Sequence, residues 1–196
     1  MILENSPKTS WSRTSRHPKV HHTAYVHPTA VLIGDVRVCE NAMICPNVVL
    51  RADEGLTIII GAGANIQDGV IMHCLKGGSI EIGQGCSIAH CALVHGPALI
   101  GRETFVGFRA IVHNARLGKN SFISHGAMVL NVELPDDSSV PVGRIIQSEA
   151  EARELPAIAL QEISFKHEVQ QINKELGRGY RERDDEIFAQ AAMGAE

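Results

Sequence analysis

The chain has 196 residues and a formal net charge of −4, from 22 acidic and 18 basic side chains. This length suits one domain with an appendage, and the charge, without any block of five or six basic residues, gives no reason to expect a nucleic-acid partner. The first 17 residues contain no apolar run of signal-peptide length, and no later stretch approaches a membrane span.

The numbers of cysteine and aromatic residues indicate the redox state of the thiols and the composition of the core. Five cysteines are an odd number without framework spacing, which predicts reduced thiols and a cytoplasmic protein. Five phenylalanines, two tyrosines and one tryptophan are few for this length. We therefore expect a core of small aliphatic side chains that stack regularly.

Residues 1–18 are predicted to form an irregular N-terminal arm, in which Trp11 is a candidate for a docking contact. Residues 19–146 carry a repeat, in which an apolar residue recurs every six positions. The clearest run is Ile82, Ile88, Val94, Ile100, Val106 and Val112. The repeating unit reads apolar-Gly-x-x-small-x, as in residues 82–87 and 100–105.

A period of six fits neither an amphipathic helix nor a hairpin strand. It fits a solenoid of short parallel strands, in which three units of six close one triangular coil of about 18 residues and the repeated apolar residue points inward. The alternative is a β-sandwich of short strands, which needs hairpin dipeptides and turn signals every 8–12 residues. The repeat predicts an all-β solenoid.

Residues 147–177 change in composition and are predicted to be helical. Residues 148–151 read Ser-Glu-Ala-Glu, a capping box that opens a short helix, and Pro156 closes it. A longer helix follows, with an apolar stripe that should pack along the solenoid or against a neighbour: Phe165, Val169, Ile172 and Leu176. Gly177 is the predicted stop, and residues 178–196 are predicted to be a charged, loose tail.

Three histidines share one position in the repeat. His95 and His113 each follow an inward-pointing valine and are 18 positions apart, so they lie on successive coils at a spacing of about 4.8 Å. His73 joins them once an insertion of four residues within 75–81 is removed. The three should form one column on the outer surface.

His90 belongs to the preceding unit and therefore lies on an adjacent face of the triangle. Two column histidines and a third from another chain could bind one metal, and three imidazoles with an open fourth position form a catalytic zinc pattern. A closed three-fold ring supplies equivalent interfaces. The alternative is that these outward-pointing histidines are solvent-exposed polar residues that bind no metal. Cys74 and Cys91 are alternative soft ligands, although small buried thiols are their expected role.

Three segments, residues 51–55, 65–73 and 89–97, resemble the signature segments of γ-class carbonic anhydrases. The similarity runs from about residue 22 to residue 180. The resemblance implies a left-handed parallel β-helix of hexapeptide repeats with a C-terminal α-helix, although the general crossover rule favours the opposite hand. It also implies a homotrimer with the metal between subunits, bound by His73 and His95 of one chain and His90 of its neighbour.

The same resemblance assigns further residues. Arg51, Asp53 and Asp68 resemble ion pairs that hold the subunits together, rather than surface charges of little worth. Gln67 resembles the residue that orients the metal-bound water, and Glu54 lies where a carboxylate could receive its proton. Asn173 matches an asparagine that contacts bicarbonate, with a solvated helix position as the alternative.

The implied activity is the reversible hydration of CO2 to bicarbonate. A divalent metal, zinc or alternatively iron or cobalt, lowers the pKa of bound water to about 7, and the resulting hydroxide attacks CO2. The archaeal prototype of the family carries a long acidic loop with a proton-shuttling glutamate. Here residues 74–78 are short and Lys76 takes the place of that glutamate, which is typical of the branch lacking the loop. We hypothesise that His113 relays protons instead.

Two other functions remain open. Some relatives of these enzymes are non-catalytic metal-binding scaffold proteins, which would keep the ligands but lose groups such as Gln67 and Glu54. Hexapeptide acyltransferases share the β-helix but usually need a single histidine as base, with a cofactor groove between subunits. Three converging histidines are more than acyl transfer requires.

Overall fold

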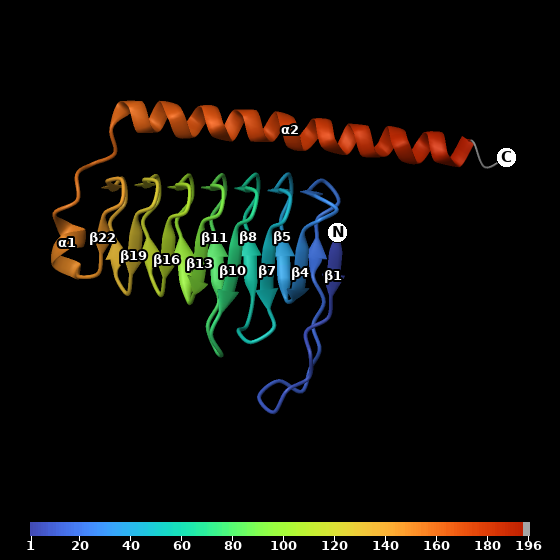
Figure 1. Ribbon diagram of the computed structural model, residues 1–196, viewed down its shortest axis with the longest axis horizontal. Coiled ribbons are helices and arrows are strands. Elements are labelled where there is room, and N and C mark those ends of the chain that lie inside the picture. The colour runs from blue at the N-terminus through green and yellow to red at the C-terminus, as the bar shows by residue number, and fades with distance from the viewer. Residues whose placement is uncertain (194–196) are drawn as a thin grey trace.

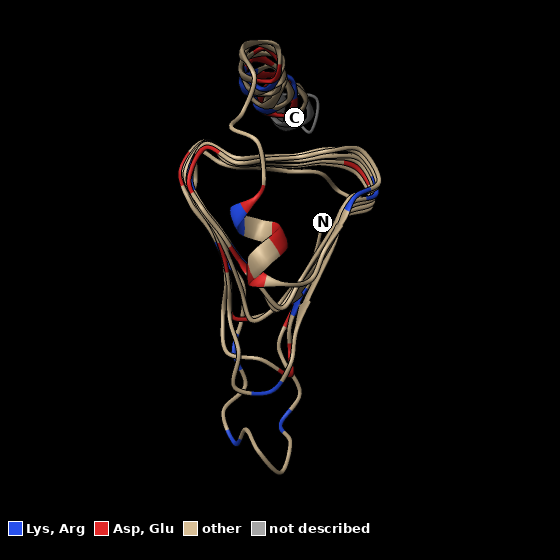
Figure 2. Ribbon diagram, turned by 90° about the vertical axis from the view of Figure 1, so that its left-hand side faces the viewer, with Lys and Arg blue, Asp and Glu red and all other residues tan. Residues whose placement is uncertain are grey.

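The computed structural model describes residues 1–193, without the side chains of Phe188 and 191–193, and shows a left-handed parallel β-helix followed by two α-helices (Figure 1). The predicted fold class is confirmed. Viewed along its axis the solenoid is triangular, with the long helix above one side (Figure 2). No helix within residues 1–193 is both long enough and apolar enough to cross a bilayer.

The described strands form three parallel sheets, one on each side of the triangle. Sheet A contains β1 (Ile2–Glu4), β4 (Val31–Gly34), β7 (Val49–Ala52), β10 (Ile71–Cys74), β13 (Leu93–Gly96), β16 (Ile111–His113), β19 (Met128–Leu130) and β22 (Ile145–Ile146). Sheet B contains β2 (Lys19–Val20), β5 (Val36–Val38), β8 (Ile58–Ile60), β11 (Ile80–Ile82), β14 (Ala98–Ile100), β17 (Arg116–Leu117) and β20 (Glu133–Leu134). Sheet C contains β3 (Tyr25–Val26), β6 (Met43–Ile44), β9 (Asn65–Ile66), β12 (Ser87–Ile88), β15 (Phe105–Val106), β18 (Phe122–Ile123) and β21 (Ser139–Val140).

The six-residue repeat builds the core as predicted. Each of the six clearest repeat positions is at most 1% exposed: Ile82, Ile88, Val94, Ile100, Val106 and Val112. The glycine that follows the repeat residue lies where coils approach closely. A Cβ added to Gly83 would be 2.6 Å from the Arg102 nitrogen of the next coil, and one added to Gly101 would be 2.5 Å from the Lys119 nitrogen. The repeat therefore selects glycine because a side chain would collide with backbone.

The short helix α1 (Glu149–Arg153) begins at the predicted capping box. The Ser148 hydroxyl accepts a hydrogen bond from the Glu151 nitrogen at 3.3 Å. The Glu151 carboxylate in turn accepts from the Gln147 nitrogen and the Ser148 hydroxyl. These contacts satisfy free donors of the first turn, and the helix ends before Pro156.

The long helix α2 (Leu160–Met193) lies along sheet C (Figures 1 and 2). The Phe165 ring packs against Phe105 and Phe122 with centroid distances of 5.5 and 6.2 Å. Further along the helix, Tyr180 stacks on Tyr25 at 5.0 Å. The predicted apolar stripe thus reaches the solenoid, but part of it stays open, because Ile172 is 49% and Leu176 45% exposed.

The predicted stop at Gly177 is wrong, because α2 continues to Met193. Gly177 is buried, and a Cβ added to it would lie 3.5 Å from the Met43 Cβ. The glycine is therefore the point of closest approach between α2 and sheet C, not a helix end. Residues 178–193 of the predicted loose tail are helical, and 194–196 lie outside the described residues.

The N-terminal arm is less irregular than predicted, because β1 pairs with β4 and adds a strand to sheet A. Between β1 and β2 the chain forms a loop that projects from the vertex opposite α2 (Figure 2). Trp11 is 48% exposed on this loop, and the Lys76 Nζ lies 5.8 Å from its ring centroid. The arm is anchored by Asp35, whose carboxylate accepts hydrogen bonds from Arg16 at 3.2 Å and Thr57 at 2.9 Å.

Replacing Gly177 with alanine tests the continuity of α2. Alanine gains about 1 kcal/mol over glycine in a helix interior, and the space beside Met43 accepts a methyl group at ordinary contact distance. We expect the Gly177→Ala protein to be as stable as the parent or more stable in urea unfolding, with unchanged helicity by circular dichroism. A loss of about 1 kcal/mol would instead indicate a left-handed glycine at a helix end.

The ion pairs of Asp35 predict how stability depends on pH. Burial raises the pKa of this carboxyl, but hydrogen bonds from Arg37 and Thr57 and the charges of Arg37 and Arg16 outweigh burial and lower it below its usual value. A lowered pKa contributes stability above the unfolded-state pKa near 3.9, and that stability is lost as the pH falls through the folded-state value.

We expect the parent to exceed Asp35→Asn in stability by a constant amount at neutral pH, measured by urea unfolding. The difference should shrink once the pH falls below about 4. A difference that does not change with pH would contradict an ionised, stabilising Asp35.

Candidate metal centre

The predicted histidine column exists. His73, His95 and His113 occupy matched positions on β10, β13 and β16, and Arg51 holds the same position one coil earlier on β7. Ring centroids are 5.5 Å apart between His73 and His95 and 5.3 Å apart between His95 and His113. The four inserted residues fall between β10 and β11, outside the strands, so they leave the register intact.

Two column histidines carry buried nitrogens without a hydrogen-bond partner, His73 Nε2 and His95 Nδ1. Buried polar atoms in proteins are almost always paired, so each exception calls for a missing partner. Burial, and then the neighbouring His73 and His113, lower the pKa of His95. A lowered pKa favours the neutral imidazole, which is the form that binds metals. The donor set thus fits a metal ion.

Carboxylates lie beside the column at the vertex where β7 ends. Asp53 Oδ1 is 3.3 Å and Glu54 Oε2 3.7 Å from His73 Nε2. Asp53 also pairs with Arg51 of its own chain, at 3.4 Å from Nε to Oδ2. The Lys76 backbone nitrogen donates to Glu54 Oε1 at 3.3 Å, which ties the short loop to this carboxylate. We call Arg51, Asp53, Glu54, His73, His95 and His113 the column half-site.

His90 lies at the opposite edge of sheet A, in the corner after β12. Its Nδ1 is 3.0 Å from Asp68 Oδ2, a residue at the same corner one coil earlier. His95 follows His90 by five positions, which span at most about 16 Å at about 3.3 Å per extended residue, and the stretch begins with a turn at Cys91. Within residues 1–193 no group of three or more His, Cys, Asp or Glu side chains is placed to hold a metal ion.

A groove between α2 and sheet C, about 390 Å³ in volume, brings together four predicted residues, Gln67, Asp68, His90 and Asn173. Its walls are mainly apolar. Gln67 is 5% exposed, and its Nε2 donates to Asn65 Oδ1 at 3.0 Å. Asn173 Nδ2 donates to the Val169 carbonyl at 2.8 Å. We call Gln67, Asp68, His90 and Asn173 the corner half-site.

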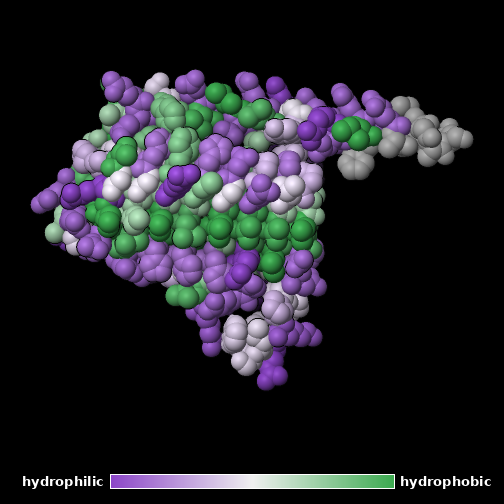
Figure 3. All heavy atoms as spheres, viewed as in Figure 1, coloured by the Kyte–Doolittle hydropathy of each residue, from purple (hydrophilic) through white to green (hydrophobic). Residues whose placement is uncertain are grey.

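An apolar row on the outside of sheet A runs between the two half-sites. It consists of eight residues in register, Ile2, Val31, Val49, Ile71, Leu93, Ile111, Met128 and Ile145. Figure 3 shows a continuous hydrophobic band across this face, and Ile71 is 47% exposed. Contiguous exposed apolar surface of this kind marks an interaction site. This row is not among the features predicted from the sequence, although its residues share one position when the coils are aligned.

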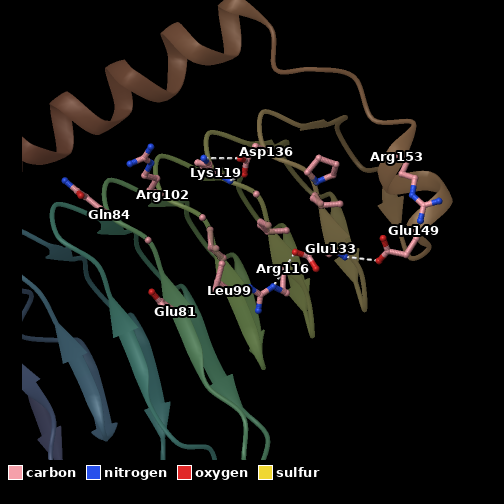
Figure 4. A pocket seen from close by; sticks show the side chains of 17 residues that line it. Glu81, Gln84, Leu99, Arg102, Arg116, Lys119, Glu133, Asp136, Glu149 and Arg153 are labelled. Atoms are coloured by element: carbon pink, nitrogen blue, oxygen red, sulfur yellow. Dashed lines mark hydrogen bonds and ion pairs between the residues drawn. The ribbon is translucent and has the colours of Figure 1, made fainter.

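A larger hollow lies elsewhere, on sheet B, with a volume of about 780 Å³ (Figure 4). Its lining is charged and largely paired within the chain. Arg116 lies 3.5 Å from Glu133, and Lys119 lies 3.2 Å from Asp136. None of the ten predicted site residues lines it. Volume alone therefore does not locate the chemistry of this protein.

Known proteins resemble this chain in sequence and in fold. No protein-family model matches the sequence. The carbonic anhydrase of Methanosarcina thermophila is 33% identical over 202 aligned residues, which cover 92% of this chain and 81% of the relative. The carboxysome assembly protein CcmM of Nostoc is 40% identical over 185 residues, or 89% of this chain and 33% of the relative. The chain thus spans about a third of the length of CcmM.

Solved structures agree on the fold. A Bacillus cereus protein described provisionally as an acetyltransferase superposes with a TM-score of 0.77, covering 92% of this chain and 97% of its own. At 20% sequence identity this similarity shows the architecture alone.

Proposed function

This chain belongs to the family of γ-class carbonic anhydrases and their relatives, and we propose that it is a metal-dependent carbonic anhydrase. It hydrates CO2 reversibly to bicarbonate at the subunit interfaces of a homotrimer. The observation that supports this best is the pairing of His73 and His95 in register on neighbouring strands, each with a buried ring nitrogen that makes no hydrogen bond within the chain.

The site is completed by a neighbouring copy. One chain supplies His73 and His95 from its column half-site, and the next chain supplies His90 from its corner half-site. Both half-sites flank the apolar row of sheet A, so burial of that row against a second copy brings them together. A closed three-fold ring repeats the same contact three times and leaves no unpaired surface.

A ligand set of imidazoles accepts zinc, iron or cobalt, and of these we propose zinc. When bound, such a metal supplies hydroxide at neutral pH by lowering the pKa of water. Gln67 orients the attacking water, and Glu54, 3.7 Å from His73, receives its proton. Asn173 contacts bicarbonate from the groove side.

The charged residues Arg51, Asp53 and Asp68 are not metal ligands. They form ion pairs across the interface, in addition to their contacts within one chain. The five free thiols support a cytoplasmic location.

A non-catalytic scaffold is the second candidate, and the 40% identity to the carboxysome assembly protein CcmM favours it. The presence of both Gln67 and Glu54 favours the enzyme. An acyltransferase is supported by fold similarity alone. CO2 hydration by metal-loaded protein separates the first candidate from the other two, and acetyl-CoA binding without metal would favour the third.

Replacing His73 with alanine should remove the metal. We expect bound zinc to fall to background by elemental analysis, and stopped-flow CO2 hydration to fall at least about a hundredfold, since a ligand is lost. The control is His167→Ala, an exposed histidine of α2, which should keep both. Full metal content in His73→Ala would contradict the assigned site.

Replacing Ile71 with glutamate should dissociate the trimer, because a charge in the apolar row would be buried without a partner. Sedimentation velocity should show a monomer with unchanged circular dichroism, and bound metal should be lost together with the assembly. The control is Leu160→Glu, an 84% exposed apolar residue outside the row. If Ile71→Glu stays trimeric with metal bound, the row is not the interface.

The role of His113 remains a hypothesis, which a buffer experiment can test. Its ring lies 5.3 Å from that of His95, and imidazole side chains commonly serve as proton shuttles. We expect His113→Ala to lower CO2 hydration about a hundredfold in weak buffer, the low end for a lost proton-transfer group, and added imidazole to restore it. An unchanged rate in weak buffer would exclude the relay.

A further inference from the structure

The ring of His90 is flanked on two sides by residues of its own corner of the solenoid. Residues Asp68, His90, Phe108 and His125 stand at matched corner positions on four successive coils. On one side, Asp68 Oδ2 is 3.0 Å from His90 Nδ1. On the other, the Phe108 ring lies 5.4 Å from the His90 ring and tilted by 39°.

Behind Phe108 stands a further ring. His125 stacks on Phe108 at 4.2 Å, with an angle of 7° between the ring planes. Its Nδ1 accepts a hydrogen bond at 3.1 Å from the Phe108 backbone nitrogen. The bond holds the His125 ring in place, and the stack on that ring restrains the Phe108 side chain, even though this side chain is 40% exposed.

We propose that Asp68, Phe108 and His125 are positioning residues that hold the His90 ring with Nε2 as its metal-binding nitrogen before a second copy arrives. The inference rests on the proposed function, since it takes His90 as a metal ligand. It adds an element to that function: the corner half-site is organised within one chain, by residues that do not touch the metal.

The chemistry of imidazole supports this assignment. A neutral imidazole has one N–H and one lone pair, so a ring that donates from Nδ1 to a carboxylate presents its lone pair on Nε2. The side chain of His90 is 51% exposed and would otherwise sample several rotamers. A flat aromatic neighbour on the side away from Asp68 restricts this freedom, because rotation would break the ring contact.

The separation of the half-sites makes such organisation useful. His73 and His95 of the same chain lie at the far edge of sheet A and cannot order His90. A ligand already oriented in the free chain loses less conformational entropy when the metal binds. We therefore expect the corner residues to change metal affinity without being ligands.

The test compares Co²⁺ binding to assembled Phe108→Ala and His125→Ala proteins with the parent. Dissociation constants come from competition with a chelator, and the Co²⁺ absorption spectrum reports ligand geometry. We expect affinity to fall about tenfold to a hundredfold, the usual cost of removing support behind a ligand, with an altered spectrum. Phe108→Tyr keeps the ring and should restore both.

The control is Leu160→Ala, which removes an exposed apolar side chain of α2 that lies outside the groove between α2 and sheet C. It should keep the parent affinity and spectrum.

In the metal-free parent, long-range ¹H–¹⁵N NMR should show the His90 proton on Nδ1, and this preference should weaken in Asp68→Asn.

The results separate a failure of the metal site from a failure of the positioning role. If His90→Ala binds Co²⁺ as tightly as the parent, the metal site itself is wrong. If His90→Ala loses tight binding while Phe108→Ala and His125→Ala match the parent in affinity and spectrum, the site stands and the positioning role is overturned.

Discussion

Backbone hydrogen bonding between successive coils is the constraint on which this structure depends. Each strand of sheets A, B and C bonds to the strand one coil before and one coil after it, so every position in the repeat acquires an equivalent neighbour about 4.8 Å away. Side chains at one position must therefore form a row. The column of imidazoles, the apolar row and the corner residues that flank His90 are all consequences of this register.

The same constraint separates the predicted site residues into two half-sites. Rows run along the solenoid axis, and the two half-sites lie at opposite edges of sheet A, so His90 and His95 of one chain belong to different rows. The unpartnered nitrogens of His73 and His95 and the exposed apolar row then have one joint explanation, a second copy seated on sheet A.

Sequence alone predicted the features that follow from the repeat. The inward row, the capping box of α1 and the column of His73, His95 and His113 could be counted, because a period of six fixes direction. Features set by packing between elements could not be counted. Gly177 resembles a helix stop in sequence, and only its contact with Met43 shows that α2 passes over it.

Pairing of β1 with β4 and the stacking of His125 on Phe108 likewise depend on which coils become neighbours outside the clearest repeats. The roles of Gln67, Glu54 and Asn173 rest on resemblance to the family. The structure adds only that Gln67 and Asn173 share a groove with His90 and that Glu54 lies beside His73.

The central claim is that one metal ion is bound by two chains, and subunit mixing tests it most directly. His90→Ala keeps the column half-site intact, and His95→Ala keeps the corner half-site intact, so neither protein alone should bind metal tightly. Refolded together, they should form mixed trimers in which an intact column faces an intact His90, and both metal binding and CO2 hydration should reappear. Mixed trimers that bind no metal would contradict a site shared between chains.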